Sequence, residues 1–324
     1  MSTNRLEMIK VYKLDSLKYT PFDENFILND YLYLSERLKF VEHPKDAKII
    51  ITSSEKHIFR NPSLLLRNKK FLIWTNEPRV STKQKSFRLF NLFSKIHVMN
   101  VYTKSVFVNQ VTYQKKRFKS NSPLSLEVNY KKDKQCVALM SFYNGGRNSK
   151  LIVNSNNVDL IKLRSEIALY GYKYGFLDIY GKGWPQGISK EDSRNNNWVE
   201  RKKEILGKYR FNLCFENTIA ENYITEKIWD SIENYCLPIY FGGMGHSIYK
   251  IFPKNGFIDY AEFKTPKELF DYIAQISEVE YNERLQKCIA VYNSFIAKPE
   301  SFWIDTKKQQ LDKIIETCEN MMSN

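Results

Sequence analysis

One stretch in the second half of the chain has the clearest alternation of hydrophobic and polar positions. Residues 210–215 mix aromatic and aliphatic side chains, as a buried strand does, and the polar run 216–222 follows at once. Thr225 is placed to cap a helix that ends near residue 234, with apolar positions at helical spacing: Ile228, Trp229, Ile232 and Tyr235. A short apolar run, 237–241, then leads into glycines. The pattern predicts a βαβ unit.

The first third of the chain shows the same alternation of strand-like and helix-like segments. Strand patterns occur at 9–12, 48–53 and 71–74, and helix patterns occur at 26–41 and 61–66. Strands that alternate with helices in this way predict an α/β fold with a parallel sheet.

The length of 324 residues suggests two domains of about 150 residues each. A basic stretch, 115–134, precedes a second series of α/β elements and is polar enough to be a domain connection. We expect an N-terminal Rossmann-like domain over residues 1–130 and a C-terminal one over 131–300. A charged helix is predicted over 301–324.

The formal net charge of +14 indicates an anionic partner, or else a basic surface that only keeps the protein soluble. A nucleotide diphosphate, an anionic glycolipid or membrane surface, and nucleic acid all fit that charge. No helix-turn-helix spacing or aromatic platform motif is visible, so we expect no nucleic-acid partner. The 43% hydrophobic content is sufficient for buried sheets.

The five cysteines are odd in number and widely spaced among apolar neighbours, which predicts reduced packing residues and indicates no zinc site. No apolar run approaches about 18 residues, and the N-terminus lacks the apolar core of a signal peptide. We therefore expect a cytoplasmic protein, unless a leader has been removed.

Polar side chains gather where the first strand of the βαβ unit ends and its helix begins: Glu216, Asn217, Tyr223, Glu226 and Lys227. Ligands of open α/β sheets bind at this edge, where helix N-termini favour anions. Lys227 in the first turn opposes the helix dipole by roughly 0.3–1 kcal/mol, and a bound diphosphate would reverse that effect. Glu226 suits the vicinal hydroxyls of a sugar. The alternative is an ordinary solvated helix start.

This stretch, F-x-L-x-F-E-N-T-x-x-x-x-Y-x-T-E-K, resembles the donor-binding signature of the α1,3/4-fucosyltransferases of glycosyltransferase family ten. The matching residues are Phe211, Leu213, Phe215, Glu216, Asn217, Thr218, Tyr223, Thr225, Glu226 and Lys227. The resemblance implies a GT-B type α/β fold, with two Rossmann-like domains facing a central cleft. It also implies inverting transfer of L-fucose from GDP-β-L-fucose to O3 or O4 of N-acetylglucosamine in a glycan acceptor.

A second candidate for chemistry is Glu77, which follows the strand at 71–74 and precedes Pro78. A carboxylate at the carboxyl end of a strand can reach a substrate as a general base. The resemblance gives this position the same role, although the family's serine between glutamate and proline is missing here.

Three further residues are candidates for the donor's phosphates. Asn144 and Arg147 lie in a loop with two glycines after a predicted strand, and such loops let backbone N–H groups approach phosphates. The resemblance assigns Arg194 to the diphosphate, because an arginine precedes the signature by roughly 20 residues in bacterial members. The sequence has no D-x-D motif, so we expect no required cofactor, although a divalent cation could stimulate transfer.

Two other functions remain open: a GT-B glycosyltransferase with a different nucleotide sugar, and a carbohydrate-binding protein without turnover. The expected partners are GDP-fucose and an oligosaccharide or glycolipid acceptor. Phe302 and Trp303, beside the final helix, suggest a peripheral contact with the inner face of the membrane. In GT-B folds this helix often returns to the first domain.

Overall fold

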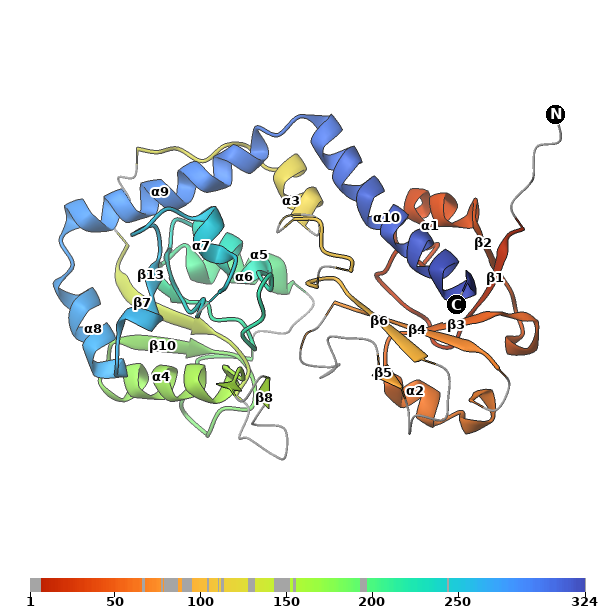
Figure 1. Ribbon diagram of the computed structural model, residues 1–324. Coiled ribbons are helices and arrows are strands. Elements are labelled where there is room, and N and C mark those ends of the chain that lie inside the picture. Colours follow the sequence, from red (N-terminus) through yellow and green to blue (C-terminus); the bar gives the residue numbers. More distant parts are fainter. Residues whose placement is uncertain are drawn as a thin grey trace. The chain divides into compact units, whose positions relative to one another are not determined.

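The computed structural model describes residues 7–65, 68–76, 78, 87–88, 95–103, 105–109, 111, 114–127, 132–142, 152–153, 156–192, 197–243 and 245–323. The chain forms two compact units. The first unit comprises Met1–Thr112 and Pro299–Asn324, and the second unit comprises Tyr113–Lys298. Each unit contains a mostly parallel sheet with helices packed against it (Figure 1).

The sheet of the first unit confirms the strands predicted from the first third of the chain. Across the sheet the strands are β2 (Leu38–Phe40), β1 (Ile9–Lys13), β3 (Ile49–Thr52), β4 (Lys70–Thr75), β6 (Lys95–Asn100) and β5 (Phe87–Arg88). Neighbouring strands are parallel except for the β5–β6 pair. The chain runs from β1 to β2 on one side of it, and then crosses to β3 on the other side. The strand order therefore reverses between β1 and β3.

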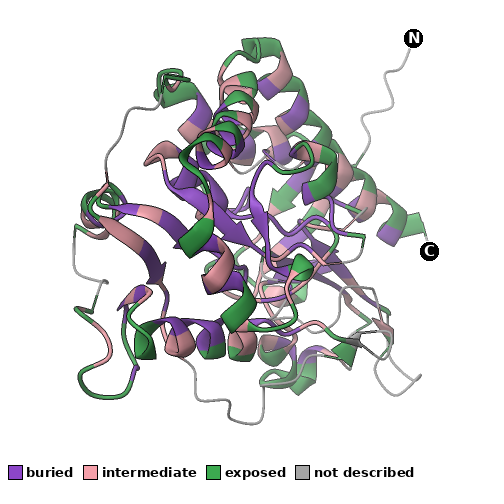
Figure 2. Cartoon of the chain, turned by 90° about the vertical axis from the view of Figure 1, so that its left-hand side faces the viewer, coloured by how far each residue is buried: buried purple, intermediate pink, exposed green. Residues whose placement is uncertain are grey.

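Both faces of this first sheet are buried. Ile49 and Ile51 of β3 pack in one apolar cluster, and Ile50 between them packs in the other. The first cluster includes Leu311 and Ile314 from helix α10 (Glu300–Ser323), whereas the second includes Ile58 from helix α2 (Glu55–Phe59). Figure 2 shows the strands largely buried and the helices exposed on one side. Burial on both faces explains the continuous apolar runs in the sequence.

The second unit has a fully parallel sheet among its described residues. Its strands are β10 (Leu177–Tyr180), β7 (Lys134–Leu139), β11 (Tyr209–Leu213), β12 (Leu237–Tyr240) and β13 (Ile258–Asp259). Its longer helices are α4 (Ile161–Lys173), α5 (Trp198–Leu206), α6 (Glu226–Glu233), α8 (Pro266–Gln275) and α9 (Glu278–Ile296). The predicted βαβ unit is β11, α6 and β12, and it is confirmed. The chain runs from β7 to β10 on one side and then crosses to β11 on the other side, so the strand order reverses between β7 and β11.

Two predicted helices of the first unit are wrong in extent. The pattern at 26–41 forms helix α1 (Leu28–Ser35) and then β2, because Leu38 turns into the core and its strand pairs with β1. The pattern at 61–66 gives only a short 3₁₀ turn at Pro62–Leu64. The α-helix comes earlier, as α2, where the Ser54 side chain accepts the N–H of Lys56 and caps it.

The basic stretch predicted as a domain connection instead begins with helix α3 (Lys115–Ser120), which lies in the second unit. Phe118 is buried against Trp229 of α6, at a ring-centroid distance of 5.2 Å. Arg117 forms ion pairs of 2.6 Å with both Asp230 and Glu233. The second unit therefore starts at Tyr113 rather than at residue 131, because an apolar anchor and acidic partners hold the basic residues.

The C-terminal segment from Pro299 belongs to the first unit. Trp303 is only 1% exposed and Phe302 is half-buried, and the membrane contact suggested from this pair stays a prediction. None of the described helices is long and apolar enough to span a membrane. The five cysteines are free and buried, in agreement with their prediction as packing residues.

Candidate functional site

The signature residues lie at the carboxyl edge of the second sheet, in the loop after β11 and the first turn of α6. The strand order of this sheet reverses next to that loop, between β7 and β11. In doubly wound sheets such a reversal leaves a crevice at the carboxyl ends of the strands, and ligands bind there. The topology therefore places the predicted donor residues at the binding position of this fold.

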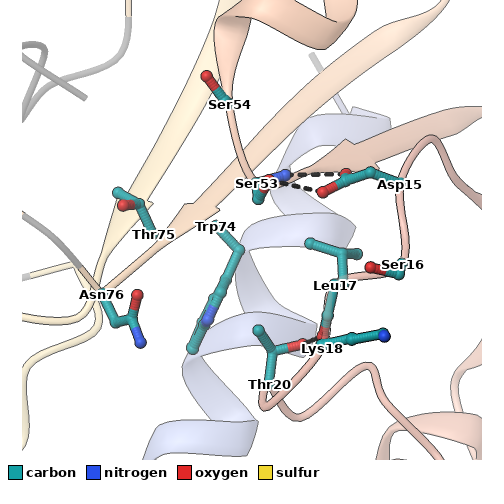
Figure 3. Close-up of a pocket in the computed structure, with 10 residues that line it drawn as sticks. All are labelled: Asp15, Ser16, Leu17, Lys18, Thr20, Ser53, Ser54, Trp74, Thr75 and Asn76. Carbon is teal, nitrogen blue, oxygen red and sulfur yellow. Dashed lines mark hydrogen bonds between the residues drawn. The ribbon is translucent and has the colours of Figure 1, made fainter. Parts of the chain in front are cut away.

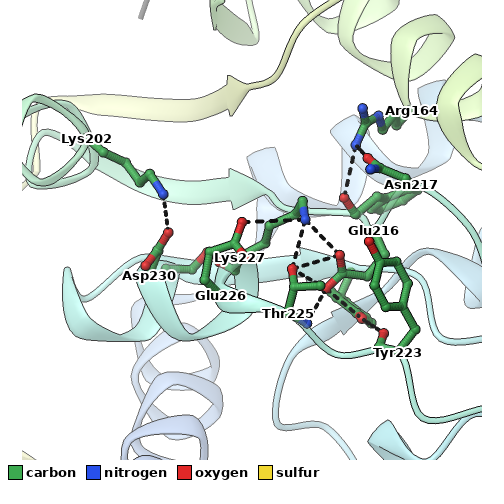
Figure 4. Close-up of polar contacts among 12 residues, drawn as sticks. Arg164, Lys202, Glu216, Asn217, Tyr223, Thr225, Glu226, Lys227 and Asp230 are labelled. Carbon is green, nitrogen blue, oxygen red and sulfur yellow. Dashed lines mark hydrogen bonds and ion pairs between the residues drawn. The ribbon is translucent and has the colours of Figure 1, made fainter. Parts of the chain in front are cut away.

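The Glu216 carboxylate is the centre of the polar contacts at this edge (Figure 4). One oxygen accepts the backbone N–H of Thr225 at 2.7 Å, and both oxygens lie 2.9 Å from the Thr225 hydroxyl. The ammonium of Lys227 donates to the other oxygen at 2.8 Å, and the Tyr240 hydroxyl lies 3.4 Å from the first. Glu216 is 1% exposed. Glu216 therefore holds Lys227 and the loop after β11 in place, and because it is buried a ligand has little access to it.

Lys227 has a counter-ion that the sequence pattern did not reveal. Its ammonium also lies 2.8 Å from the Thr225 hydroxyl and 3.6 Å from the Glu226 carboxylate. Burial lowers the pKa of Lys227, but the charges of Glu216 and Glu226 outweigh this and the pKa is raised. Glu216 therefore already provides an anion beside Lys227, and the contact of Lys227 with a donor diphosphate stays a prediction. Its side chain is 26% exposed and can still contact a ligand.

Glu226 is the exposed acidic member of this group, with 48% of its side chain accessible. Burial raises its pKa, but the Lys227 charge outweighs this and the pKa is lowered, so Glu226 is ionised at neutral pH. Thr225 occupies the predicted N-cap position of α6, yet its side chain makes no capping bond because it contacts Glu216 and Lys227. The role of the exposed Glu226 carboxylate as an acceptor for sugar hydroxyls stays a prediction.

Asn217 contacts a residue that sequence reasoning missed. Its side-chain oxygen accepts a 2.7 Å hydrogen bond from buried Arg164 of α4, which also donates to the Phe215 carbonyl. The backbone carbonyl of Asn217 accepts the N–H of Leu160. A signal was available, because Arg164 lies three residues before Ile167, at a spacing that puts both on the buried face of α4. Arg164 fixes the position of the loop after β11.

Tyr223 and His246 are both buried at this edge. The Tyr223 carbonyl lies 3.3 Å from the Tyr240 hydroxyl and 3.3 Å from Nε2 of His246. Nδ1 of His246 accepts the N–H of Ile248, so Nε2 carries the proton and donates to Tyr223. Burial lowers the pKa of His246 to about 4, and the imidazole is neutral at pH 7. His246 is therefore a structural residue of this loop.

The buried imidazole predicts a pH-dependent stability. An unfolded histidine with a pKa of 6.5 binds its proton before His246 does, so the free energy of unfolding falls as pH drops from 6.5 towards 4. This lowering of the His246 pKa corresponds to a loss of up to roughly 3 kcal/mol in the free energy of unfolding at low pH. Urea unfolding of His246→Gln between pH 7 and 4.5 should show a shallower decline than the original protein. Part of the decline with pH should remain in the variant, because the pKa of His97 is also lowered to about 4. Equal slopes would contradict this account.

Four of the predicted site residues lie outside the described residues: Glu77, Asn144, Arg147 and Arg194. Their assignments stay predictions. Within the described ranges, no three side chains of His, Cys, Asp or Glu gather into a possible metal site.

Residues 148–323, just over half of the chain, match the family described as "Glycosyltransferase family 10 (fucosyltransferase) C-term". The chain belongs to glycosyltransferase family 10. Over 75 residues this family member is 44% identical to alpha-(1,3)-fucosyltransferase FucT of Helicobacter pylori, covering 23% of this chain and 15% of that protein. Over 106 residues it is 30% identical to human 4-galactosyl-N-acetylglucosaminide 3-alpha-L-fucosyltransferase FUT6, covering 32% of this chain and 26% of that protein.

A third relative is GDP-fucose protein O-fucosyltransferase 3 of Xenopus tropicalis, 33% identical over 112 residues, which cover 33% of this chain and 23% of that protein. The matched segments thus span only 15% to 26% of these curated relatives. A crystal structure of an alpha1,3-fucosyltransferase with GDP resembles this chain with a TM-score of 0.51 and 17% identity, covering 92% of this chain and 93% of that one. The likeness confirms the predicted GT-B type, with two Rossmann-like α/β domains.

Proposed function

We propose that this family 10 member is an inverting fucosyltransferase that moves L-fucose from GDP-β-L-fucose to a hydroxyl of a glycan acceptor, with O3 or O4 of N-acetylglucosamine as the favoured position. The observation that carries the proposal is the exposed Glu226 beside Lys227, where the second sheet reverses its strand order. A carboxylate accepts sugar hydroxyls and an ammonium attracts phosphate, and a nucleotide sugar offers both groups. The names of the Helicobacter and human relatives support fucose as the sugar.

Inverting transfer needs a base for the acceptor hydroxyl and positive charge for the departing GDP. In this proposal Glu77 is the base, Lys227 and Arg194 stabilise the diphosphate, and Glu226 holds a sugar hydroxyl. Asn144 and Arg147 contribute to the phosphate site. The structure suggests that Glu216, Asn217 and Tyr223 act indirectly, because their contacts hold the loop that presents Glu226 and Lys227.

A comparison of nucleotides tests the donor. Thermal unfolding with GDP, UDP, GMP and a short oligonucleotide should show the largest stabilisation by GDP, because binding to the folded state alone raises its stability. A larger shift with UDP would favour the alternative of a GT-B enzyme with a different nucleotide sugar. Fucosylated product from GDP-fucose and N-acetyllactosamine distinguishes the enzyme from a carbohydrate-binding protein without turnover.

Glu226→Gln should weaken binding of GDP-fucose by roughly 10- to 100-fold, because it replaces a charged acceptor, and a hydrogen bond to a charged group contributes about 1.5–3 kcal/mol. Isothermal titration measures this. This variant tests donor binding more specifically than Lys227→Ala, because Lys227→Ala would also leave the buried Glu216 carboxylate without its closest cation. The melting temperature should stay within about 2 °C, since exposed charges contribute little to stability.

Glu200→Gln is the matched control for this variant. Glu200 lies in the first turn of α5 and its side chain is 66% exposed, so the same chemical change occurs at another helix start. The control should bind GDP-fucose like the original protein. If Glu226→Gln also binds normally, Glu226 is not a donor contact and its assignment is withdrawn.

A further inference from the structure

The start of helix α1 in the first unit carries a cluster of apolar side chains that face solvent. Phe26, Ile27 and Leu28 follow one another in the chain, and Leu32 lies one turn after Leu28 on the same face of the helix. All four are exposed, Leu28 by 57% and Leu32 by 52%. Single exposed apolar residues are normal, but a contiguous group usually marks a surface that binds a partner.

The loop before α1 adds Tyr19 to this cluster. The Tyr19 side chain is exposed, whereas Leu17 is buried, and both residues have a left-handed backbone with φ values of 62° and 44°. The Asp23 carboxylate accepts the N–H of Tyr19 at 3.1 Å, and the Thr20 hydroxyl donates to the Leu17 carbonyl at 2.5 Å. The rings of Tyr19 and Phe26 meet edge to face, with centroids 5.5 Å apart. Specific contacts therefore hold this aromatic pair at the surface.

Ile27 occupies the N-cap position of α1, where small polar side chains are strongly preferred. Its side chain makes no capping hydrogen bond, whereas a serine or aspartate would accept one of the free N–H groups of the first turn. Natural sequences break such local rules mainly at functional sites. An exposed isoleucine at this position is therefore better explained by a contact outside the folded unit.

Helix α10 continues the apolar surface beside α1. The two helices lie side by side (Figure 1), because Asp30 pairs with Lys307 at 3.0 Å and Tyr33 donates to Asp312 at 2.6 Å. Both pairs advance in the same direction, so the start of α1 lies near the start of α10. Ile304 is exposed there, one turn before Lys307. The apolar α1 surface, as we call it, consists of Tyr19, Phe26, Ile27, Leu28, Leu32 and Ile304.

The size and composition of the apolar α1 surface favour a lipid bilayer over a second copy of the chain. It has six side chains, whereas a stable protein interface typically has about 20–30 residues on each side. Its aliphatic side chains and phenylalanine can enter the boundary between headgroups and acyl chains. Tyrosine, which Tyr19 contributes, is enriched where a protein meets the membrane–water interface.

The charges near this surface allow an approach to anionic headgroups. Lys18 lies in the same loop and points away from Trp74 (Figure 3). Two nearby carboxylates already have partners, because Asp23 accepts backbone N–H groups and Asp30 pairs with a lysine of α10. Glu24 is exposed and opposes the attraction locally. The net charge of +14 still favours an anionic membrane at longer range.

We infer that the apolar α1 surface docks this protein on a lipid bilayer, with Phe26, Leu28 and Leu32 inserted below the headgroups. Helix α1 has eight residues, so it lies on the membrane and does not span it. This surface is separate from the Phe302–Trp303 pair. The inference goes beyond the proposed function, because binding to lipid requires no transfer of fucose.

The test is co-sedimentation of the full chain with vesicles of phosphatidylglycerol and phosphatidylethanolamine. The double variant Leu28→Gln, Leu32→Gln should bind these vesicles about 10- to 100-fold more weakly, because burial of one leucine side chain already corresponds to roughly a factor of ten. Glutamine keeps the helix propensity, and both leucines are more than half exposed, so the melting temperature should stay within about 2 °C.

Val279→Gln is the matched control for the double variant. Val279 is 68% exposed in the first turn of α9, in the second unit, so the control also exchanges an exposed apolar side chain at a helix start for glutamine. It should bind the vesicles like the original protein. If the double variant melts at a lower temperature, Phe26→Gln takes its place, because Phe26 lies outside the helix.

Three results would overturn the membrane contact. The first is equal binding of the original protein and the glutamine variants, which would leave net charge as the only attraction. The second is no sedimentation of the original protein with these vesicles at low salt. The third is a dimer in analytical ultracentrifugation without lipid that the double variant dissociates, because the partner would then be a second copy of the chain.

Discussion

Glu77→Gln is expected to lower the rate of fucose transfer by about 10²- to 10⁴-fold, the usual effect of removing a general base. The acceptor hydroxyl must lose its proton as it attacks, and an amide cannot take that proton at neutral pH. The affinity for GDP-fucose should remain nearly unchanged, because the proposed donor residues Glu226 and Lys227 lie in the second unit. Single-turnover kinetics and isothermal titration measure these two quantities separately.

The pH profile provides a second measurement of the same change. In the original protein the rate should fall at low pH as the carboxylate of the base is protonated, and Glu77→Gln should lack this decline. Glu55→Gln is a suitable comparison, because Glu55 begins α2 shortly after β3 ends and offers another carboxylate at the carboxyl edge of the first sheet. Retention of more than about a tenth of the turnover in Glu77→Gln would exclude Glu77, since general-base removal costs more than that. A large loss in Glu55→Gln would then identify the base.

Glu216→Ala should cost about 3–5 kcal/mol of folding free energy, the usual penalty for removing one partner of a buried ion pair. The change deprives Lys227 of its closest counter-ion and leaves the N–H of Thr225 without its carboxylate acceptor. For a domain of 150–250 residues, each kcal/mol shifts the melting temperature by about 2–4 °C, so a decrease on the order of 10 °C is expected. Differential scanning calorimetry measures it.

Glu226→Ala is the control for this stability effect. Its carboxylate also lies near Lys227, at 3.6 Å, but it is exposed, and such pairs typically contribute about 0–1 kcal/mol. The lowered pKa of Glu226 means that this small contribution is present above pH 4.5 and is lost as pH falls through the folded pKa. If both alanine variants melted within about 2 °C of the original protein, Glu216 would not be the residue that anchors the loop.

The sequence predicted most of what depends on local periodicity. The apolar runs 49–51 of β3 and 71–74 of β4 were recognisable because both faces of the sheet are covered, so consecutive positions are apolar. The βαβ unit around Glu226 was recognisable because the apolar residues of α6 follow helical spacing, although Asp230 and Ser231 between them are buried as well. The order of these elements alone predicted which edge of the sheet carries the site, because ligands of such sheets bind at the carboxyl ends of the strands.

What the sequence could not predict depends on partners distant along the chain. Glu216 and Lys227 are 11 residues apart, and only the fold shows that their charges balance. Arg164 lies 53 residues before Asn217 and appeared to be an ordinary helix residue. The basic stretch containing α3 appeared to be a linker, because the acidic partners of Arg117 lie more than a hundred residues later, on α6. Charge patterns predict a site only when both partners are close in sequence.

The first unit is assembled from both ends of the chain, and this affects the order in which the protein can fold during synthesis. Helix α10 supplies Leu311, Ile314 and Met321 to the core beneath β1 and β3, and Tyr33 of α1 donates a 2.6 Å hydrogen bond to Asp312. These residues leave the ribosome after the whole second unit. The second unit, complete at Lys298, therefore has all of its own residues first.

During that interval the strands synthesised first lack the helix that covers one of their faces. Domains usually fold in N-terminal to C-terminal order during synthesis, and uncovered sheet faces are prone to aggregate. Here α10 follows the second unit in the chain, so Ile49, Ile51 and Leu72 lack part of their packing until α10 has been synthesised. One face of the first unit's sheet can therefore be covered completely only after the second unit has been synthesised.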